Sequence, residues 1–366
     1  MNAPWPSVLR GRLDKHLLTS EALRSNPLGD PAERPMWVYV PPGYDERDGR
    51  RYPTVYLLQG FFGHLDMWAN RAPFTPPFIE EVDRAFASGS IPPAILVFID
   101  SWTSYGGSQF LDSPGTGRYH SYFCDEIVPW VDGHYRTVDA QGGRAVSGKS
   151  SGGYGALVSA MLRPDLFGGV ACHAGDALFE YTCFAKFPKC VRFLRAYGGD
   201  IERWWRDFSE RGRVGRPEDP SLLIVYGMSA CLSPTPDGVP QLPFDPVSGA
   251  VRAEVWQRWL ALDPVRMIPA HADAWRGMRA VWIDCGAQDE HFLDVGAQGL
   301  RAALSAVGVT DDALFHFELF PGAHGGLDHR YLLSLDWLSR RLERNDPAVR
   351  SAAGEIALAG TREVTR

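Results

Sequence analysis

The chain contains few cysteines, and they follow no pattern that binds a metal or forms a disulfide framework. The six cysteines include no Cys-x-x-Cys pair and no regular spacing. This predicts reduced, mostly buried thiols of a cytoplasmic protein. A single disulfide between Cys183 and Cys190 is the exception that the spacing leaves open. We expect no metal site and no cofactor.

Long apolar runs and an excess of positive charge are also missing. No apolar run approaches the roughly 18 residues of a membrane span. Residues 1–6 lack the basic and apolar regions of a secretory signal. The formal net charge of -7 argues against nucleic acid or an anionic membrane as a partner. These absences favour a cytoplasmic protein that acts on a small molecule, and they leave a homo-oligomer open.

The sequence does contain a regular alternation of short apolar runs with helical patterns. A chain of 366 residues, 45% hydrophobic and 22% charged, is expected to bury a large core in one domain or in a domain with an insert. The expected strands are residues 36–40, 54–58, 94–99, 144–147, 168–172, 278–283 and 314–320. The expected helices are residues 77–87, 119–135, 154–162, 292–307 and 328–342. This order predicts an α/β fold, with a mostly parallel sheet and helices on both faces.

The alternation is interrupted once, in residues 175–276, where aromatic residues and a Pro/Gly stretch occur without it. Inserts of this length in a compact fold are often lids. We therefore divide the chain into a core of residues 1–174 and 277–344, a cap or lid insert at 175–276, and a tail at 345–366 with few large apolar residues. The alternative is an insert that serves only as a subdomain with its own small core.

Two catalytic motifs overlap in residues 142–155. Residues 148–152 fit the G-x-S-x-G nucleophile elbow, and residues 143–150 fit the G-x-x-x-x-G-K-[ST] loop that binds phosphate. The phosphate-binding loop needs a buried strand before its first glycine, but residues 136–142 are polar and turn-like. The elbow needs a strand before its serine, small neighbours and a helix after it, and the sequence supplies all three. We expect Ser150 to be a nucleophile, and a nucleotide-binding P-loop protein is the less favoured alternative.

A serine nucleophile needs a base that takes its proton and an acid that orients the base. His324 lies in a glycine-rich loop directly after the last expected strand, where a hydrolase fold places its base. Asp289 lies in the loop after the preceding strand, from which it can reach His324. The less favoured acids in this stretch are Asp284, Glu290 and Asp294.

The oxyanion of a tetrahedral intermediate needs two backbone N–H donors. One donor is expected from Ser151, the residue after the nucleophile. The other is expected from Phe61, in the loop of residues 60–63 that follows the second expected strand. Glycines at both ends of this loop allow its backbone to approach the substrate closely.

Loops that follow the parallel strands predict the shape of the substrate pocket. These loops start at one edge of the sheet, so their side chains should converge there. The residues expected to contact substrate are Phe62, Trp102, Asp176 and Phe179. A pocket with aromatic side chains from three loops favours a bulky apolar or aromatic acyl group. The alternative is that the insert's tryptophans serve only its own core; they are Trp204, Trp205, Trp256 and Trp259.

Taken together, these residues resemble a known family. The chain is similar to the esterase D group of α/β-hydrolases, which includes S-formylglutathione hydrolases, feruloyl esterases, enterochelin esterases and mycolyltransferases. The similar stretches are residues 56–60, 112–119, 148–157, 286–289 and 322–324. The resemblance implies an α/β-hydrolase fold, acyl-ester chemistry and a triad of Ser150, Asp289 and His324. The chain departs from the family at Lys149, where His or Glu is frequent, and at Gln59, where His is frequent.

We therefore expect a serine hydrolase that cleaves a carboxylic ester through an acyl-enzyme. An acyltransferase is the main alternative, because an alcohol or amine can attack the same acyl-enzyme where the site excludes water. A hydrolase fold retained only as a binding module is a further alternative, which the complete set of three residues disfavours. Lys149 can either hold an acidic substrate or point to solvent, and we expect the latter.

Overall fold

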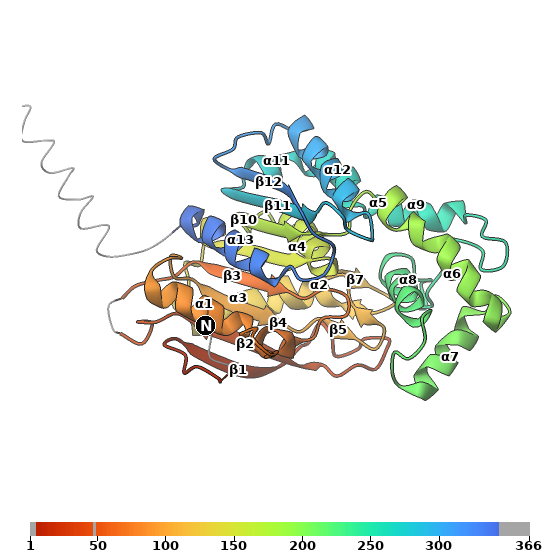
Figure 1. The fold of residues 1–366 in the computed structure, drawn as a ribbon, viewed down its shortest axis with the longest axis horizontal. Coiled ribbons are helices and arrows are strands. Elements are labelled where there is room, and N and C mark those ends of the chain that lie inside the picture. The colour runs from red at the N-terminus through yellow and green to blue at the C-terminus, as the bar shows by residue number, and fades with distance from the viewer. Residues whose placement is uncertain (1–4, 47–48, 344–366) are drawn as a thin grey trace, which may run out of the picture.

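A single sheet of eight strands forms the centre of the computed structural model, which describes residues 5–46 and 49–343 (Figure 1). The strands are β1 (Arg12–Thr19), β2 (Glu33–Val40), β3 (Thr54–Leu58), β4 (Ile95–Ile99), β9 (Arg144–Lys149), β10 (Gly169–His173), β11 (Ala280–Gly286) and β12 (Phe315–Phe320). Their order in the sheet is β1-β2-β4-β3-β9-β10-β11-β12. Strand β2 is antiparallel to both β1 and β4, and the other neighbours are parallel. The tail predicted at residues 345–366 lies outside the described residues.

The strands predicted from the sequence are all present, with ends that shift by a few residues. Strand β1 was not among the predicted strands. Its alternate residues are exposed, because it forms the edge of the sheet. Two short hairpins also lie between β4 and the next helix. They pair β5 (Trp102–Thr103) with β6 (Gly106–Gly107), and β7 (Asp112–Ser113) with β8 (Gly117–Arg118).

Helices cover both faces of the sheet, as the alternation of elements predicts. They are α1 (Phe78–Ser88), α2 (Tyr119–Ser121), α3 (Val128–His134), α4 (Ser151–Leu162), α12 (Leu293–Ala306) and α13 (Asp328–Arg341). A π-helical turn, η2 (Tyr122–Ile127), joins α2 to α3. Tyr56 and Leu58 of β3 face a core shared with α2–α4 and α12. The alternate residues Val55 and Leu57 face α1 and α13.

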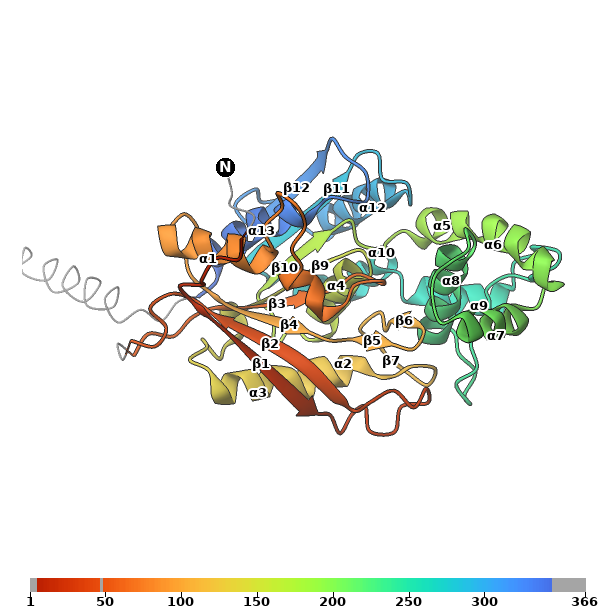
Figure 2. The ribbon, with the colours of Figure 1, turned by 60° about the horizontal axis from the view of Figure 1, so that its bottom comes forward.

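The segment between β10 and β11 is helical. Its α-helices are α5 (Phe179–Thr182), α6 (Phe187–Leu194), α7 (Ile201–Arg211), α8 (Asp219–Leu232), α9 (Ala253–Ala261), α10 (Pro264–Met267) and α11 (Ala272–Arg276). Its 3-10 helices are η4 (Phe184–Lys186), η5 (Arg195–Tyr197) and η6 (Ile268–His271). Helices α6–α9 form a lobe beyond one end of the sheet (Figures 1 and 2). Helices α10 and α11 instead contact α4 and α12, so the end of residues 175–276 belongs to the layer that covers the sheet.

The lobe has an aromatic interior of its own. Trp204 and Trp259 are fully buried, and Trp256 is 8% exposed. Trp204 stacks on Phe208 with 5.7 Å between ring centres, and Trp256 lies 6.0 Å from Trp259. Trp204, Trp256 and Trp259 therefore pack inside the insert, as the alternative interpretation expected, whereas the ring of Trp205 also lies 4.8 Å from that of Tyr105 in the core.

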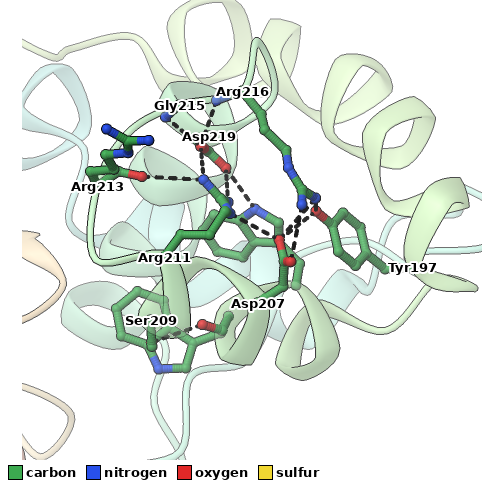
Figure 3. A network of polar contacts seen from close by, with 10 residues as sticks. Tyr197, Asp207, Ser209, Arg211, Arg213, Gly215, Arg216 and Asp219 are labelled. Carbon is green, nitrogen blue, oxygen red and sulfur yellow. Dashed lines mark hydrogen bonds and ion pairs between the residues drawn. The ribbon is translucent and has the colours of Figure 1, made fainter.

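A buried carboxylate ties α7 to the start of α8 (Figure 3). Asp219 accepts hydrogen bonds of 2.8 Å from both terminal nitrogens of Arg211. It also accepts from the backbone N–H groups of Gly215 at 3.0 Å and Arg216 at 2.9 Å. Burial alone would raise the pKa of Asp219. The hydrogen bonds from Arg211 and the two backbone groups have a larger and opposite effect, so the pKa lies well below its ordinary value.

All six cysteines are buried free thiols, so the disulfide between Cys183 and Cys190 does not form. Of the helices in residues 5–46 and 49–343, none combines the length and the apolar character that crossing a membrane requires.

Candidate active site

Ser150 lies at a sharp turn between β9 and α4. Strand β9 ends at Lys149, and α4 begins at Ser151. Ser150 between them has φ 57° and ψ -124°, a strained conformation for a residue with a side chain. Its backbone N–H donates to the carbonyl of His173 at 2.9 Å, which holds the turn against β10. The P-loop interpretation required a loop over the residues that form β9, so it is wrong.

Glycines on either side of the turn allow the close backbone contacts that it requires. A Cβ atom at Gly148 would clash with the carbonyl of Gly152. A Cβ atom at Gly152 would clash with the carbonyl of Leu58, at the end of β3. The nucleophile motif thus carries glycine at these two positions for a steric reason.

The loops after β11 and β12 bring an acid and a histidine together. The Nδ1 atom of His324 lies 2.8 Å from the Oδ2 atom of Asp289. The other oxygen of Asp289 accepts the backbone N–H of His291 at 2.8 Å, and the residue is 5% exposed. Burial raises the pKa of Asp289, but the hydrogen bond and charge of His324 outweigh it and leave the pKa below its ordinary value. The backbone N–H of His324 also donates to Glu290 at 2.9 Å.

Asp284, the second candidate for the acid, lies in a different cluster. It is fully buried at the end of β11, and its Oδ1 atom lies 2.6 Å from Nδ1 of His173. Its Oδ2 atom accepts from Trp282 and from Arg330, both at 2.8 Å. These contacts occupy both carboxylate oxygens, so Asp284 supports the sheet under α13 and does not orient His324.

Ser150 and His324 line one cavity of about 260 Å³. Residues of the core and of the insert share its wall. The other lining residues are Gly60, Phe61, Phe62, Gly63, Met67, Gln109, Lys149, Asp176, Lys186, Ile224, Met228, His291, Leu293, Asp328 and Tyr331. The insert thus forms part of the cavity that contains the candidate nucleophile.

The expected oxyanion donors lie next to this cavity. Ser151 is the first residue of α4, so its backbone N–H has no acceptor inside the helix. A Cβ atom at Gly60 would be 3.6 Å from the Cβ atom of Ser150, so the loop after β3 runs beside the nucleophile. The next residue, Phe61, lines the cavity, and its ring packs against Gly227 of α8. The helix dipole of α4 adds partial positive charge at the same place.

Two of the four residues expected to contact substrate line this cavity, and two do not. Phe62, which is 46% exposed, and Asp176, which is 8% exposed, both lie on its wall. Phe179 is fully buried instead and stacks on Tyr154, with 6.0 Å between ring centres. Trp102 also lies outside the cavity wall, because its short hairpin directs it elsewhere. Its ring centre is 6.5 Å from that of His64.

The expected convergence of aromatic side chains from three loops is therefore wrong. Of the three loops, only the one after β3 places aromatic rings, those of Phe61 and Phe62, in the cavity wall, and the ring of Tyr331 there comes from helix α13. Met67, Ile224, Met228 and Leu293 supply the rest of the apolar wall. The insert's tryptophans do not line this cavity, and three of them, Trp204, Trp256 and Trp259, pack among the insert's helices.

Several cavity residues are absent from the predictions made from sequence. Gln109 is 1% exposed, accepts a hydrogen bond from the hydroxyl of Ser151, and has a left-handed backbone with φ 52°. The ring of His291 lies 5.0 Å from that of His324, and burial and the charge of Lys186 lower its pKa. Lys149 was expected to point to solvent, but it is half-buried in the cavity wall.

No group of three His, Cys, Asp or Glu side chains is placed to hold a metal ion within residues 5–46 and 49–343.

Known proteins share both the sequence pattern and the fold. The model of the Esterase family matches residues 30–307. The esterase Rv1288 of Mycobacterium tuberculosis is 31% identical over 144 residues, which are 38% of this chain and 28% of that protein. An endo-1,4-beta-xylanase/feruloyl esterase of Xylanibacter ruminicola is 26% identical over 168 residues, which are 45% of this chain and 22% of that protein. The chain spans less than a third of the length of these relatives.

Solved structures of esterases superpose on most of the chain. A ferulic acid esterase matches with a TM-score of 0.58 and 20% identity, over 92% of this chain and 100% of that chain. An S-formylglutathione hydrolase from Agrobacterium tumefaciens matches with a TM-score of 0.51 and 17% identity, over 92% of this chain and 98% of that chain. These similarities confirm the predicted α/β-hydrolase fold, and with the family match they confirm the resemblance to the esterase D group.

Proposed function

Because the chain belongs to the Esterase family, we propose that it is a serine hydrolase that cleaves carboxylic esters through an acyl-enzyme. The observation that carries this proposal is the 2.8 Å contact between His324 and Asp289, beside a cavity that Ser150 and His324 both line. A serine on a strained elbow, followed along the chain by an acid and a histidine, is the arrangement that such a triad requires.

The proposed catalytic residues have distinct tasks. His324 takes the proton of the Ser150 hydroxyl as its oxygen attacks the ester carbonyl, and Asp289 holds the proton on the other ring nitrogen. The backbone N–H groups of Ser151 and Phe61 stabilise the oxyanion. The alcohol leaves with the proton from His324, and Ser150 keeps the acyl group. A water molecule activated by His324 then releases the acid and restores the serine.

We also propose that the insert helps to set the acyl specificity. Phe61 and Phe62 of the core face the cavity together with Ile224 and Met228 of α8. A bulky apolar or aromatic acyl group, such as the one named in the ferulic acid esterase, would be stabilised by burial against these side chains at about 25 cal/mol per Å².

A fluorophosphonate probe tests the nucleophile directly. We expect the probe to label the wild-type protein at Ser150, and the substitution Ser150→Ala to abolish both labelling and hydrolysis of p-nitrophenyl acetate. The attached phosphonyl group is located by mass spectrometry of the digested protein. Labelling of the Ser150→Ala variant at the wild-type level would refute the proposed function.

A further inference from the structure

Lysine is rare in this chain, and its distribution is uneven. Of the 37 lysine and arginine residues only four are lysines, namely Lys15, Lys149, Lys186 and Lys189. All except Lys15 line the active-site cavity or the cavity beside it. Arginine supplies the positive charge elsewhere, so the compact ammonium group is concentrated around the candidate active site.

Lys149 directly precedes the nucleophile, and its half-buried side chain lines the active-site cavity. Burial lowers the pKa of its amine, and the charges of Asp328, Asp289 and Glu290 oppose this effect only in part. No hydrogen-bond acceptor contacts the ammonium group among the described residues, and none of their carboxylate oxygens lies within 4.0 Å of it. The ammonium group of Lys149 is thus partly desolvated in the cavity wall, and none of the described residues supplies it with a hydrogen-bond acceptor or a carboxylate.

A second cavity continues the first one into the insert. Its volume is about 250 Å³, and it shares Lys186, Ile224 and His291 with the active-site cavity. Lys186 is half-buried and donates a hydrogen bond to the carbonyl of Thr182. In residues 5–46 and 49–343, no carboxylate oxygen lies within 4.0 Å of its ammonium group. Lys189 is exposed on the wall of the second cavity.

Three acidic side chains line the same two cavities. Glu290 accepts the backbone N–H of His324 at 2.9 Å, and Asp328 is exposed at the start of α13, where the helix dipole stabilises its charge. Asp176 is 8% exposed, and its carboxylate has no hydrogen-bond partner among the described residues. The negative charge of Asp176 should therefore repel an anionic ligand that the lysines attract. Its removal should strengthen the binding of such a ligand, whereas removal of a lysine should weaken it.

We propose that the site takes esters that carry a carboxylate, and that Lys149 and Lys186 recognise this group. The inference rests on the proposed hydrolase function and names its substrate class. A carboxylate that enters the cavity gives these ammonium groups an ionised hydrogen-bond acceptor, which none of the described residues provides. A neutral ester of the same shape leaves both charges partly desolvated and is therefore the poorer substrate.

The test compares two matched pairs of esters. Mono-p-nitrophenyl glutarate and p-nitrophenyl valerate differ by a carboxylate on the acyl side. The pair 4-acetoxybenzoate and 4-acetoxyacetophenone differ by a carboxylate on the alcohol side. The readout is the ratio of kcat/KM for the charged member to that for the neutral member, in which a general loss of activity cancels. We expect this ratio to exceed one for at least one pair, which identifies the part of the ester that carries the charge.

Substitutions then show which residues cause the preference for the charged ester. We expect Lys149→Met and Lys186→Met each to lower the ratio about tenfold, because each removes a hydrogen-bonded charge pair. We expect Asp176→Asn to raise it. The matched control is Lys15→Met, which should keep the wild-type ratio. Lys15 lies on the edge strand with its ammonium group 4.2 Å from the ring centre of Trp37, and it lines neither cavity.

Equal kcat/KM values for both members of both pairs would overturn the proposal. It would also be overturned by lysine variants that keep the wild-type ratio, or by a lower ratio in Asp176→Asn. Failure of the hydrolase function gives a different result, because Ser150→Ala would then hydrolyse the neutral ester as fast as the wild type. Hydrolysis that depends on Ser150 but shows no charge preference would remove only this inference.

Discussion

The contact between Asp289 and His324 determines which ring nitrogen of the histidine is available to the serine. Both oxygens of Asp289 accept hydrogen bonds, one from the ring of His324 and one from the backbone of His291. The pKa of Asp289 lies below its ordinary value, so the carboxylate is ionised at neutral pH. An ionised acid retains the proton on Nδ1 of His324 and leaves Nε2 free to take the proton of Ser150.

Replacing Asp289 by its amide should therefore cause a severe loss of catalytic activity. We expect Asp289→Asn to lower kcat for p-nitrophenyl acetate about 10⁴-fold, because the amide favours the wrong tautomer of His324. Glu290→Gln is the matched control. Glu290 accepts only the backbone N–H of His324, and glutamine retains an acceptor, so its loss should stay below about tenfold. Comparable losses in the two variants would contradict the choice of Asp289 as the acid.

Residues at the ends of predicted strands could be placed from the sequence, because parallel strands end at the same edge of the sheet. Asp289 and His324 follow neighbouring strands, and their contact agrees with the prediction that they meet. Gln109 could not be placed in this way, since it reaches the cavity through an irregular loop with a left-handed backbone. Ile224 and Met228 could not be placed either, because nothing in their own pattern shows which way α8 faces.

The elements of the sheet were predictable to the extent that they are buried. Strands β3 and β4 are buried at every position, and each forms an uninterrupted apolar run. Strand β1 is an edge strand without a buried position, and three of its four exposed residues, Arg12, Lys15 and Thr19, are polar, so its sequence does not resemble that of a central strand. The insert lacks the strand-helix alternation of the core, and only its approximate limits could be predicted, because α10 and α11 at its end contact the core helices.

A substitution in helix α8 can test whether the insert sets the acyl specificity, without removal of the insert. Ile224 and Met228 lie one turn apart on α8, and both face the cavity. We expect Met228→Trp to lower kcat/KM for a bulky aryl-acyl ester about tenfold relative to p-nitrophenyl acetate, because the larger ring fills the acyl-binding space. Val239→Trp, at an insert position that is 53% exposed and outside the cavity wall, is the control. An unchanged ratio in Met228→Trp would mean that the insert does not set specificity.

At the scale of the whole molecule, the insert and the sheet share one interior. The apolar cluster that contains Trp204 and Trp259 of the insert also contains Val146 of β9 and Tyr154 of α4. The ring of Phe61, next to the nucleophile, packs against the backbone of α8. Because buried contacts run without a break from one part to the other, we expect both parts to unfold in one cooperative transition.

The buried carboxylate of Asp219 allows this expectation to be tested from inside the insert. Asp219→Asn removes the charge that both terminal nitrogens of Arg211 contact. We expect a loss of about 3 kcal/mol in the free energy of unfolding at pH 7. The pKa of Asp219 is lowered in the folded protein. Its contribution to stability is therefore complete above about pH 4 and declines as the pH falls towards the folded pKa. The difference between wild type and variant should accordingly be smaller at pH 3 than at pH 7.

Two probes followed during urea unfolding report on the two parts of the chain. Alkylation of the buried thiol of Cys190 in α6, quantified by mass spectrometry, follows the interior of the insert, and fluorophosphonate labelling follows the environment of Ser150. In the wild type their midpoints should coincide, and Asp219→Asn should shift both to lower urea by the same amount, because one continuous interior stabilises the two regions. If the variant lowers only the midpoint of Cys190 alkylation and labelling of Ser150 persists to the wild-type urea concentration, the insert unfolds independently and the shared interior does not couple it to the sheet.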